Sequence, residues 1–258
     1  MAAWQKVLVL GGTSEARRLA DALAGEPDIE AVLSYAGRTE SPAAVPIRWR
    51  VGGFGGIAGL VDYLRAEKID RVVDATHPFA AQMSAHAVAA CDAERIPLLA
   101  LERQPWRPGE GDRWTEVDTL EDAADALGAS PRRVFLGIGR LHLAAFARRP
   151  QHDYLVRLVD APRESLPLPR VAVVVARGPF DVAGDRAILE RHGSEVVVSK
   201  NAGGTAAVAK IEAARALGLP VVMVRRPRIP DRPAVETIAA VMAWLAHRDV
   251  SAGADRGV

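Results

Sequence analysis

Two kinds of apolar pattern alternate along most of the chain. Short runs rich in Val, Ile and Leu predict buried strands, and apolar residues spaced three and four apart predict amphipathic helices. In the first half, the strand pattern covers Lys6–Leu10, Ile29–Ser34, Arg71–Ala75 and Pro97–Leu101. The helical pattern covers Ala16–Leu23, Ile57–Leu64, Pro78–Glu94 and Leu120–Leu127. This alternation is typical of parallel strands joined by crossover helices, so the sequence predicts an α/β fold.

The same alternation starts again after a cluster of chain breakers at Gly128-Ala129-Ser130-Pro131. We therefore predict two domains, residues 1–130 and 131–248, followed by a flexible tail over 249–258. Strands are predicted at Arg133–Leu136, Tyr154–Val159, Val171–Ala176, Glu195–Ser199 and Pro220–Val224. Helices are predicted at Leu141–Ala147, Asp185–Arg191, Thr205–Leu217 and along an apolar stripe from Val235 to Leu245.

The two halves also echo each other around one strand. In the first half, 23 positions separate Asp74 at a strand end from Pro97 at the start of the next strand. In the second half, 22 positions separate Val198 from Pro220. Polar turns after such strands lie at the carboxyl edge of a parallel sheet, where open α/β sheets bind ligands. We therefore expect a ligand cleft between the two halves.

Composition excludes several classes of protein. No apolar run approaches the ~20 residues of a membrane helix, and no cleavage-site pattern follows Met1, so we expect a cytoplasmic protein. The single cysteine, Cys91, continues the four-residue spacing of Phe79, Met83 and Ala87, which predicts a packed thiol and not a nucleophile. No Cys or His pair has the spacing of metal ligands, and no serine-nucleophile motif is present, so we expect no metal.

Charge is distributed unevenly, although the net charge is only +1. Residues 1–130 hold 13 basic and 20 acidic residues, or −7, and residues 131–258 hold 20 and 12, or +8. Drift between two solvated surfaces explains this difference as simply as an anionic ligand on the second half does. The basic residues are scattered and not interleaved with aromatic ones, so a nucleic-acid surface has little support.

The turn after the first strand predicts phosphate binding. It reads Gly11-Gly12-Thr13-Ser14-Glu15-Ala16. Glycines let the backbone approach a pyrophosphate, and the free N–H groups of a helix start attract its charge. Thr13 takes the place of the middle glycine of the dinucleotide template, so the turn also fits a plain helix cap.

The end of the second strand indicates which dinucleotide binds. Sites for NAD usually place a carboxylate there, to bind the ribose 2′-hydroxyl. This chain instead has Ser34, Gly37, Arg38 and Thr39, with no acidic residue before Glu40. A guanidinium pairs with a phosphate, so this end favours NADPH, although an arginine after a strand is also common on plain surfaces.

Further polar turns follow other predicted strands. The Gly52-Gly53 and Gly55-Gly56 pairs form a loop that suits either a ligand or a mobile connection, and Thr76 and His77 follow the third strand. In the second half, three turns combine a cation with backbone donors. They contain Arg140, Arg177, and Lys200 with Asn201, Gly203 and Gly204. Because such turns bind carboxylates as well as phosphates, we expect an anionic ligand on this half.

Taken together, these motifs resemble the precorrin-6A reductases of cobalamin (vitamin B12) biosynthesis. The resemblance rests on Gly11–Ala16, Ser34-x-Ala36-Gly37-Arg38, Gly52-Gly53, Asp74–Ala80 and Lys200-Asn201-x-Gly203-Gly204, and it extends to about Leu245. It implies two Rossmann-like parallel-sheet domains with a cleft between them. It also implies an oxidoreductase that transfers hydride from NADPH to C19 of the tetrapyrrole precorrin-6A, with a proton to C18, giving precorrin-6B.

The resemblance also implies roles for the candidate residues. Gly12, Thr13, Ser14 and Glu15 would hold the pyrophosphate and ribose, and Ser34, Gly37, Arg38 and Thr39 would bind the 2′-phosphate. Gly53, Thr76 and His77 would lie near the nicotinamide, and Arg140, Arg177, Lys200, Asn201, Gly203 and Gly204 near substrate carboxylates. His77, Lys200 and water all remain candidates for the proton donor. A monomer acting on the cobalt-free substrate is favoured, and another NADPH-dependent reductase and a non-catalytic NADPH sensor are the alternatives.

Overall fold

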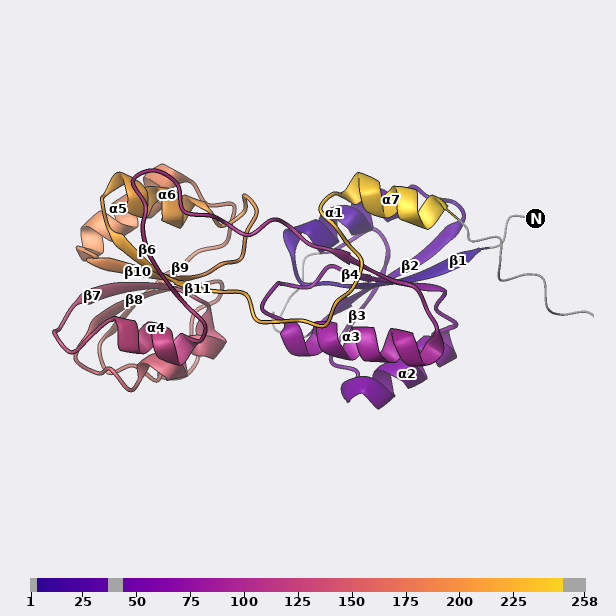
Figure 1. Ribbon diagram of the computed structural model, residues 1–258, viewed down its shortest axis with the longest axis horizontal. Helices are drawn as coiled ribbons and strands as arrows, with labels where there is room; N and C mark the ends of the chain where they lie inside the picture. The colour runs from indigo at the N-terminus through magenta and orange to yellow at the C-terminus, as the bar shows by residue number, and fades with distance from the viewer. Residues whose placement is uncertain (1–3, 37–43, 248–258) are drawn as a thin grey trace, which may run out of the picture. The chain divides into compact units, whose positions relative to one another are not determined.

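The chain forms two compact units in the computed structural model, which describes residues 4–36 and 44–247. Unit 1 contains the described residues up to Arg103 and those from Arg228 onward, and unit 2 is the continuous segment Gln104–Pro227 (Figure 1). Each unit is built around one six-stranded sheet, and every strand pairing in both sheets is parallel. The predicted α/β fold with two parallel sheets is therefore confirmed.

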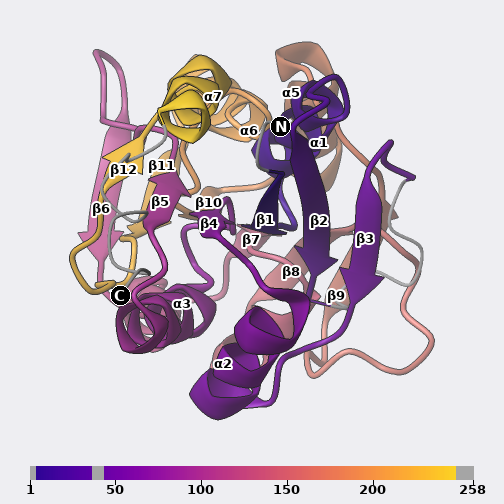
Figure 2. The same ribbon diagram turned by 90° about the vertical axis from the view of Figure 1, so that its right-hand side faces the viewer.

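The sheet of unit 1 has the strand order β12-β5-β4-β1-β2-β3 (Figure 2). Its strands are β1 (Gln5–Leu10), β2 (Ile29–Tyr35), β3 (Arg48–Val51), β4 (Arg71–Asp74), β5 (Leu98–Leu101) and β12 (Ala234–Val235). When β12 is counted as the sixth strand of this unit, the order reads 6-5-4-1-2-3, which is that of the doubly wound dinucleotide-binding fold. The short strand β12 joins this sheet although it follows the whole of unit 2 in the sequence.

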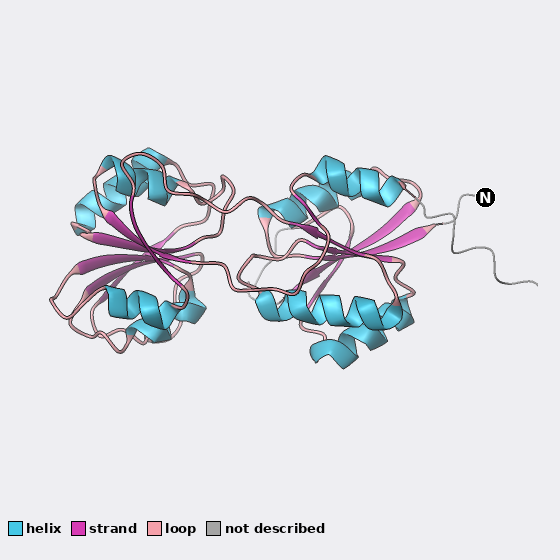
Figure 3. Ribbon diagram, viewed as in Figure 1, coloured by secondary structure: helices cyan, strands magenta, loops and turns pink. Residues whose placement is uncertain are grey.

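Helices cover both faces of this sheet (Figure 3). They are α1 (Ser14–Leu23), α2 (Gly56–Glu67), α3 (Ala81–Glu94) and α7 (Ile238–Ala246). Val7 and Val9 of β1 pack in one core with residues of α1 and α7. Leu8 and Leu10 point to the opposite face and pack with residues of α2 and α3. Because both faces are buried, the central strands are apolar at nearly every position.

Unit 2 repeats the arrangement with the strand order β6-β11-β10-β7-β8-β9. Its strands are β6 (Arg113–Val117), β7 (Arg133–Gly137), β8 (Asp153–Leu158), β9 (Val171–Val175), β10 (Val196–Lys200) and β11 (Pro220–Val224). Its helices are α4 (Leu120–Ala126), α5 (Val182–His192), α6 (Ala209–Ala216) and the 3₁₀ helix η1 (Arg140–Phe146). Residues of α5 and α6 share one buried core with Phe135, Val197 and Val221 of the sheet.

The division between the units differs from the predicted boundary at residue 130. Strand β6 pairs with β11, and α4 packs near β6 and β11, so the residues just before 130 belong to unit 2. In the other direction, β12 pairs with β5 and α7 covers unit 1. Chain breakers mark the ends of elements, and they do not report which sheet a neighbouring edge strand joins. The predicted tail, 249–258, lies outside the described residues.

This division changes the charge argument. Unit 2 holds 18 basic and 15 acidic residues, or +3, and the rest of the chain holds 15 and 17, or −2. The contrast of −7 with +8 arose because the acidic segment before residue 130 was counted with the first half. Net charge therefore gives little support to an anionic ligand on unit 2, and that prediction depends on the individual cations.

Several element boundaries also differ from the predicted ones. Helix α3 begins at Ala81 and not at Pro78, and α6 begins at Ala209 and not at Thr205. Val235 lies in β12 and not in the last helix, because the Thr237 side chain accepts a hydrogen bond from the Ala240 N–H and so caps α7 at its start. Strands β3, β6 and β12 were not predicted.

Cys91 is buried inside α3, as its spacing predicted. Burial raises the pKa of its thiol to about 12, so it is a packing residue at neutral pH. None of the described helices is long and apolar enough to cross a membrane.

A buried histidine in unit 2 predicts a loss of stability in mild acid. His152 is 0% exposed, and its Nδ1 accepts a hydrogen bond from the Arg132 N–H at 3.1 Å. Burial lowers its pKa, and burial also lowers the pKa of His192. The unfolded chain then binds more protons than the folded one below pH ~6.5. The free energy of unfolding should therefore be maintained above that pH and should fall as the pH drops below it.

Urea unfolding at pH 7.5 and pH 5.5 measures this effect. The His152→Asn variant carries an amide that does not titrate, so it should lose less stability over this interval than the wild type does. An equal loss in both proteins would show that His152 does not cause the acid sensitivity.

Candidate functional site

The sheet of unit 1 has a topological switch point between β1 and β4. From β1 the chain builds outward through β2 and β3 on one side, and β4 and β5 lie on the other. All of these strands are parallel, so the turns that follow β1 and β4 lie at the same edge. Open α/β sheets bind their ligands at this place.

The glycine turn after β1 has the backbone of a close-approach loop. A Cβ atom on Gly11 would lie 2.5 Å from Cδ1 of Leu33, and Gly12 has a φ of +119°, so a side chain is disfavoured at both positions. Thr13 is the N-cap of α1, and its Oγ1 accepts a hydrogen bond from the Ala16 N–H at 3.1 Å. The same hydroxyl donates to the carbonyl of Ala75 at 2.8 Å, which ties this turn to the turn after β4.

The predicted cap and the predicted phosphate turn are therefore compatible. Thr13 caps the helix with its side chain, and the two residues before it, Gly11 and Gly12, have no side chain. Ser14 is exposed at the first position of α1. The threonine at the middle position of the template has both of these roles, because its hydroxyl accepts from the Ala16 N–H and donates to the Ala75 carbonyl.

The turn after β4 is held by a buried carboxylate. Asp74 Oδ1 accepts hydrogen bonds from the Thr76 hydroxyl at 2.7 Å and from the Thr76 N–H at 3.1 Å. Nε of Arg232, which comes from the segment after unit 2, lies 3.5 Å from Asp74 Oδ2. His77 Nδ1 accepts a hydrogen bond from the Phe79 N–H at 3.2 Å. The ring of His77 therefore helps to shape the turn, in addition to any role toward a ligand.

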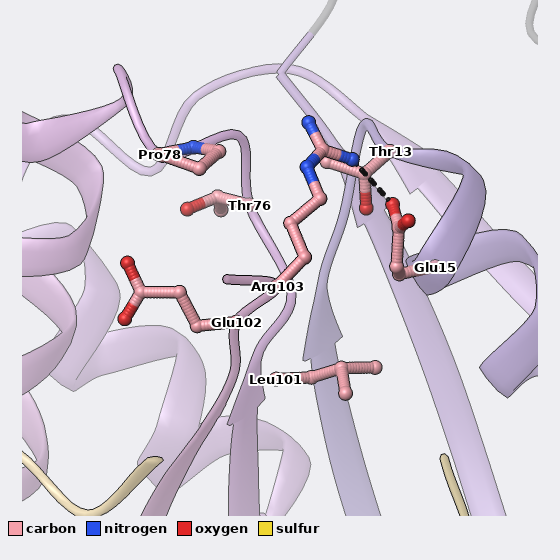
Figure 4. Close-up of a pocket in the computed structure, with 7 residues that line it drawn as sticks. All are labelled: Thr13, Glu15, Thr76, Pro78, Leu101, Glu102 and Arg103. Carbon is pink, nitrogen blue, oxygen red and sulfur yellow. Dashed lines mark hydrogen bonds and ion pairs between the residues drawn. The ribbon is translucent and has the colours of Figure 1, made fainter. Parts of the chain in front are cut away.

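A small pocket lies between these two turns and the end of β5 (Figure 4). It is lined by Thr13, Glu15, Thr76, Pro78, Leu101, Glu102 and Arg103. Arg103 Nη1 lies 2.6 Å from Glu15 Oε2, and both side chains are only 14% exposed. Glu15 also contacts Arg18 Nη2 at 3.4 Å and accepts a hydrogen bond from Ser14 Oγ at 3.0 Å. A carboxylate at the start of α1 would repel a pyrophosphate, so this neutralisation by guanidinium groups makes the turn suitable for an anion.

The ends of β2 and β3 lie beyond β1 on the other side of the switch point. Ser34 is buried there, and its hydroxyl accepts a hydrogen bond from Arg50 Nη1 at 2.8 Å. Gly53 follows β3, and its carbonyl accepts from Arg50 Nη2 at 3.2 Å. The predicted cofactor residues Gly37, Arg38 and Thr39 lie outside the described residues.

One predicted grouping is corrected by this order of strands. Gly53 was expected beside Thr76 and His77, but β3 and β4 lie on opposite sides of β1, with β2 also between them. Gly53 therefore groups with Ser34, and Thr76 and His77 group with Thr13. The glycine motif predicted a loop suited to a ligand, but it could not indicate where that loop lies in the sheet.

The cations predicted in unit 2 follow different strands of its sheet. Lys200 ends β10, and Arg140 begins η1 shortly after β7, which is the neighbour of β10. These two residues therefore belong to the switch point of the second sheet. Arg177 follows the edge strand β9, and its Nη2 lies 2.6 Å from Asp160 Oδ1 in an exposed ion pair. Arg177 is thus separated from the other two cations by strand β8.

The motif Lys200-Asn201-Ala202-Gly203-Gly204 holds a segment of the chain in place. The Asn201 side chain accepts a hydrogen bond from the Trp106 N–H at 2.8 Å and donates to the Trp106 carbonyl at 2.9 Å. The Trp106 indole N–H donates to the carbonyl of Gly204 at 2.7 Å. A Cβ on Gly203 would lie 2.2 Å from the carbonyl oxygen of Gln104. These residues therefore fasten the start of unit 2, a role that the sequence analysis did not predict.

Several residues at or beside the two sites were not predicted from the sequence. Arg103 and Glu102 follow β5, Arg50 lies in an edge strand, and Trp106 packs under Lys210 Nζ, 4.8 Å from the ring centroid. The pair Glu102-Arg103 directly follows a predicted strand, so its position was a signal available in the sequence, because ligand-binding residues of parallel sheets lie at strand ends. Arg50 had no such signal, since β3 itself was not predicted.

Comparisons with known proteins bear on this site. The chain matches the family model described as "Precorrin-6x reductase CbiJ/CobK" over residues 6–246. It is 56% identical over 241 residues to the precorrin-6A reductase of Rhodobacter capsulatus, covering 93% of this chain and 96% of that protein. It is 30% identical over 256 residues to the cobalt-precorrin-6A reductase of Priestia megaterium, covering 94% and 98%. A solved structure described as CobK precorrin-6A reductase matches with a TM-score of 0.90 and 56% identity, covering 94% of this chain and 96% of that one.

Proposed function

The chain belongs to the precorrin-6x reductase CbiJ/CobK family, and from this premise we propose that it reduces precorrin-6A to precorrin-6B with NADPH. The observation that supports the substrate most strongly is the identity of 56% to the precorrin-6A reductase of Rhodobacter capsulatus over nearly the full length of both chains. In this reaction NADPH supplies a hydride to C19 of the macrocycle, while C18 takes up a proton.

The geometry of unit 1 supports a dinucleotide as the cofactor. Its sheet has the doubly wound strand order, and its glycine turn lies between β1 and α1 at the switch point. Gly12, Thr13 and Ser14 would hold the pyrophosphate at the start of α1, and Arg103 would offset the charge of Glu15. Thr76 and His77 would contact the half of the cofactor on the β4 side of the switch point.

The chain's own part in the chemistry is binding and orientation. The Asp74 carboxylate fixes Thr76 through two hydrogen bonds, and Thr13 fixes the turn after β1 against the turn after β4. These contacts keep both walls of the pocket in place before a ligand arrives, which lowers the cost of binding. The proton for C18 has three candidate sources: His77, Lys200 and water.

The second unit is proposed to bind the substrate. Arg140 and Lys200 follow neighbouring strands at its switch point, and cations there suit the acetate and propionate groups of a tetrapyrrole. Asn201, Gly203 and Gly204 would act indirectly, because they hold the segment at Gln104–Trp106. Arg177 would contribute from the edge of the sheet, and Arg38 with Gly37 and Thr39 stays a prediction for the 2′-phosphate.

Three finer points belong to the same proposal. The cobalt-free substrate is favoured because the relative at 56% identity is named for precorrin-6A, and the relative at 30% is named for the cobalt form. A monomer in the cytoplasm remains the expected state of the protein.

An assay of NADPH oxidation with precorrin-6A tests the function. We expect loss of absorbance at 340 nm in step with the spectral change of the macrocycle, and no oxidation when precorrin-6A is left out. Tight NADPH binding without oxidation would point to a sensor, and oxidation with other substrates alone would point to another reductase. Replacing precorrin-6A by its cobalt complex in the same assay decides which form is preferred.

A further inference from the structure

Arg50 occupies the end of the β2–β3 pair in unit 1. The two strands are parallel, and Arg50 is in register with Ser34. In the doubly wound fold, this corner of the sheet lies beside the adenosine ribose of a dinucleotide. The residue there decides whether a 2′-hydroxyl or a 2′-phosphate is accepted.

The guanidinium of Arg50 is held in a fixed orientation. Nη1 donates to the Ser34 hydroxyl at 2.8 Å and to the Gly52 carbonyl at 3.0 Å, and Nη2 donates to the Gly53 carbonyl at 3.2 Å. Its central carbon lies 4.1 Å from the centroid of the Phe54 ring and 5.2 Å from that of Tyr63. Stacking of this kind suits a guanidinium because its planar face is weakly hydrated.

Among the residues that the structure describes, no acidic group balances the positive charge of Arg50. Its partners are a hydroxyl, two carbonyls and two rings, and no carboxylate in the part of the chain that the structure describes forms an ion pair with it. Arg48, two residues earlier on the same strand, contrasts with it. Arg48 donates to both carboxylate oxygens of Glu67, at 2.9 and 3.1 Å.

The remaining donors of Arg50 match an anion. A guanidinium has five N–H groups, and the hydrogen bonds above use two on Nη1 and one on Nη2. Within the described residues the Nε–H and one Nη2–H remain for a ligand, and two adjacent N–H groups of a guanidinium can bind two oxygens of one phosphate. A held guanidinium loses less conformational freedom on binding than a mobile one.

We propose that Arg50 selects NADPH over NADH by pairing with the 2′-phosphate of the cofactor, next to Ser34. The inference rests on the proposed function, because it names the selectivity residue of the same cofactor site. It is independent of Arg38, since it uses only contacts of described residues. It also explains why an arginine at an edge strand is held by backbone carbonyls instead of by an acid.

Binding of NADPH and NADH to the Arg50→Met variant tests the proposal, with 2′,5′-ADP and 5′-AMP as probes that lack the nicotinamide. Methionine keeps the stem and removes the charge. The Kd for NADPH and for 2′,5′-ADP should rise about 10- to 100-fold, while those for NADH and 5′-AMP should change little. Arg50→Lys should recover part of the selectivity, because it keeps the charge without the planar fork.

Arg48→Met is the matched control, since it removes a cation from the same strand that is already paired with Glu67. It should leave the ratio of the two Kd values unchanged. A merely structural role of Arg50 would weaken all four ligands equally, and that result would overturn the inference. Measurements on the wild-type protein distinguish failure of the proposed function from failure of the inference. If the wild type binds neither dinucleotide, the proposed function fails. If the wild type prefers NADPH and Arg50→Met keeps that preference, only the inference fails.

Discussion

Replacing Asp185 with alanine is expected to lower the free energy of unfolding of unit 2 by about 3–5 kcal/mol. Asp185 in α5 forms an ion pair with Arg157 in β8, and the two side chains are only 4% and 7% exposed. The Arg157 guanidinium also lies 3.7 Å from the centroid of the Phe180 ring and 5.6 Å from that of Phe135. Without Asp185 this charge would remain buried with no acidic partner, which is the costly outcome.

Urea unfolding, with hydrogen exchange to locate the loss in β8 and α5, measures this change. The matched control is Glu190→Ala in the same helix, because Glu190 pairs with Arg186 on the surface and should contribute less than about 1 kcal/mol. The double variant Arg157→Met/Asp185→Leu should recover most of the stability, since it removes both charges together. A loss below about 1 kcal/mol for Asp185→Ala would show that the pair does not stabilise the unit.

Replacing Arg103 with methionine is expected to raise the Kd for NADPH and for NADH alike, by about 10- to 100-fold. Arg103 contacts Glu15 in the pocket beside the glycine turn. Its loss leaves the Glu15 carboxylate less well neutralised at the helix start where the pyrophosphate is proposed to bind. Both dinucleotides contain the pyrophosphate, so their Kd ratio should not change, in contrast to the effect expected for Arg50.

Two further variants make this prediction specific. Arg18 also contacts Glu15, but its side chain is 64% exposed, so Arg18→Met should have a much smaller effect. Glu15→Gln in the Arg103→Met background should restore part of the affinity, because it removes the repelling charge. If fluorescence titration found unchanged affinity in Arg103→Met, the pyrophosphate could not lie beside this pair.

The buried parts of the fold were predicted best from the sequence. Strands such as Lys6–Leu10 and Pro220–Val224 are apolar on both faces, and that pattern depends only on burial. The unpredicted strands β3, β6 and β12 all lie at sheet edges. Strands β3 and β6 contain exposed charged residues, such as Arg48 and Arg113, because one side of an edge strand faces away from the core, and β12 has only two residues.

For the candidate site, the sequence predicted the turns after central strands but not the contacts between distant segments. Turns after central strands could be recognised because parallel strands must place them at one edge, and the structure brings Thr13 and Thr76 together there. Local sequence could not show that Asn201 bonds to Trp106, 95 residues away, or that Arg232 reaches Asp74 from beyond unit 2. Such contacts depend on the tertiary fold, which brings together segments that are far apart in the sequence, so no short motif can predict them.

The position of β12 after unit 2 in the sequence also affects how the protein folds during synthesis. Unit 2 is one continuous segment, so a ribosome has released all its strands once Pro227 has emerged. The sheet of unit 1 is completed later, because β5 lacks its outer neighbour until Ala234 and Val235 are synthesised. During that interval the edge of β5 is an open template for pairing with another chain. Truncation before residue 234 should therefore yield a protein that aggregates, even though it contains every residue that lines the pocket.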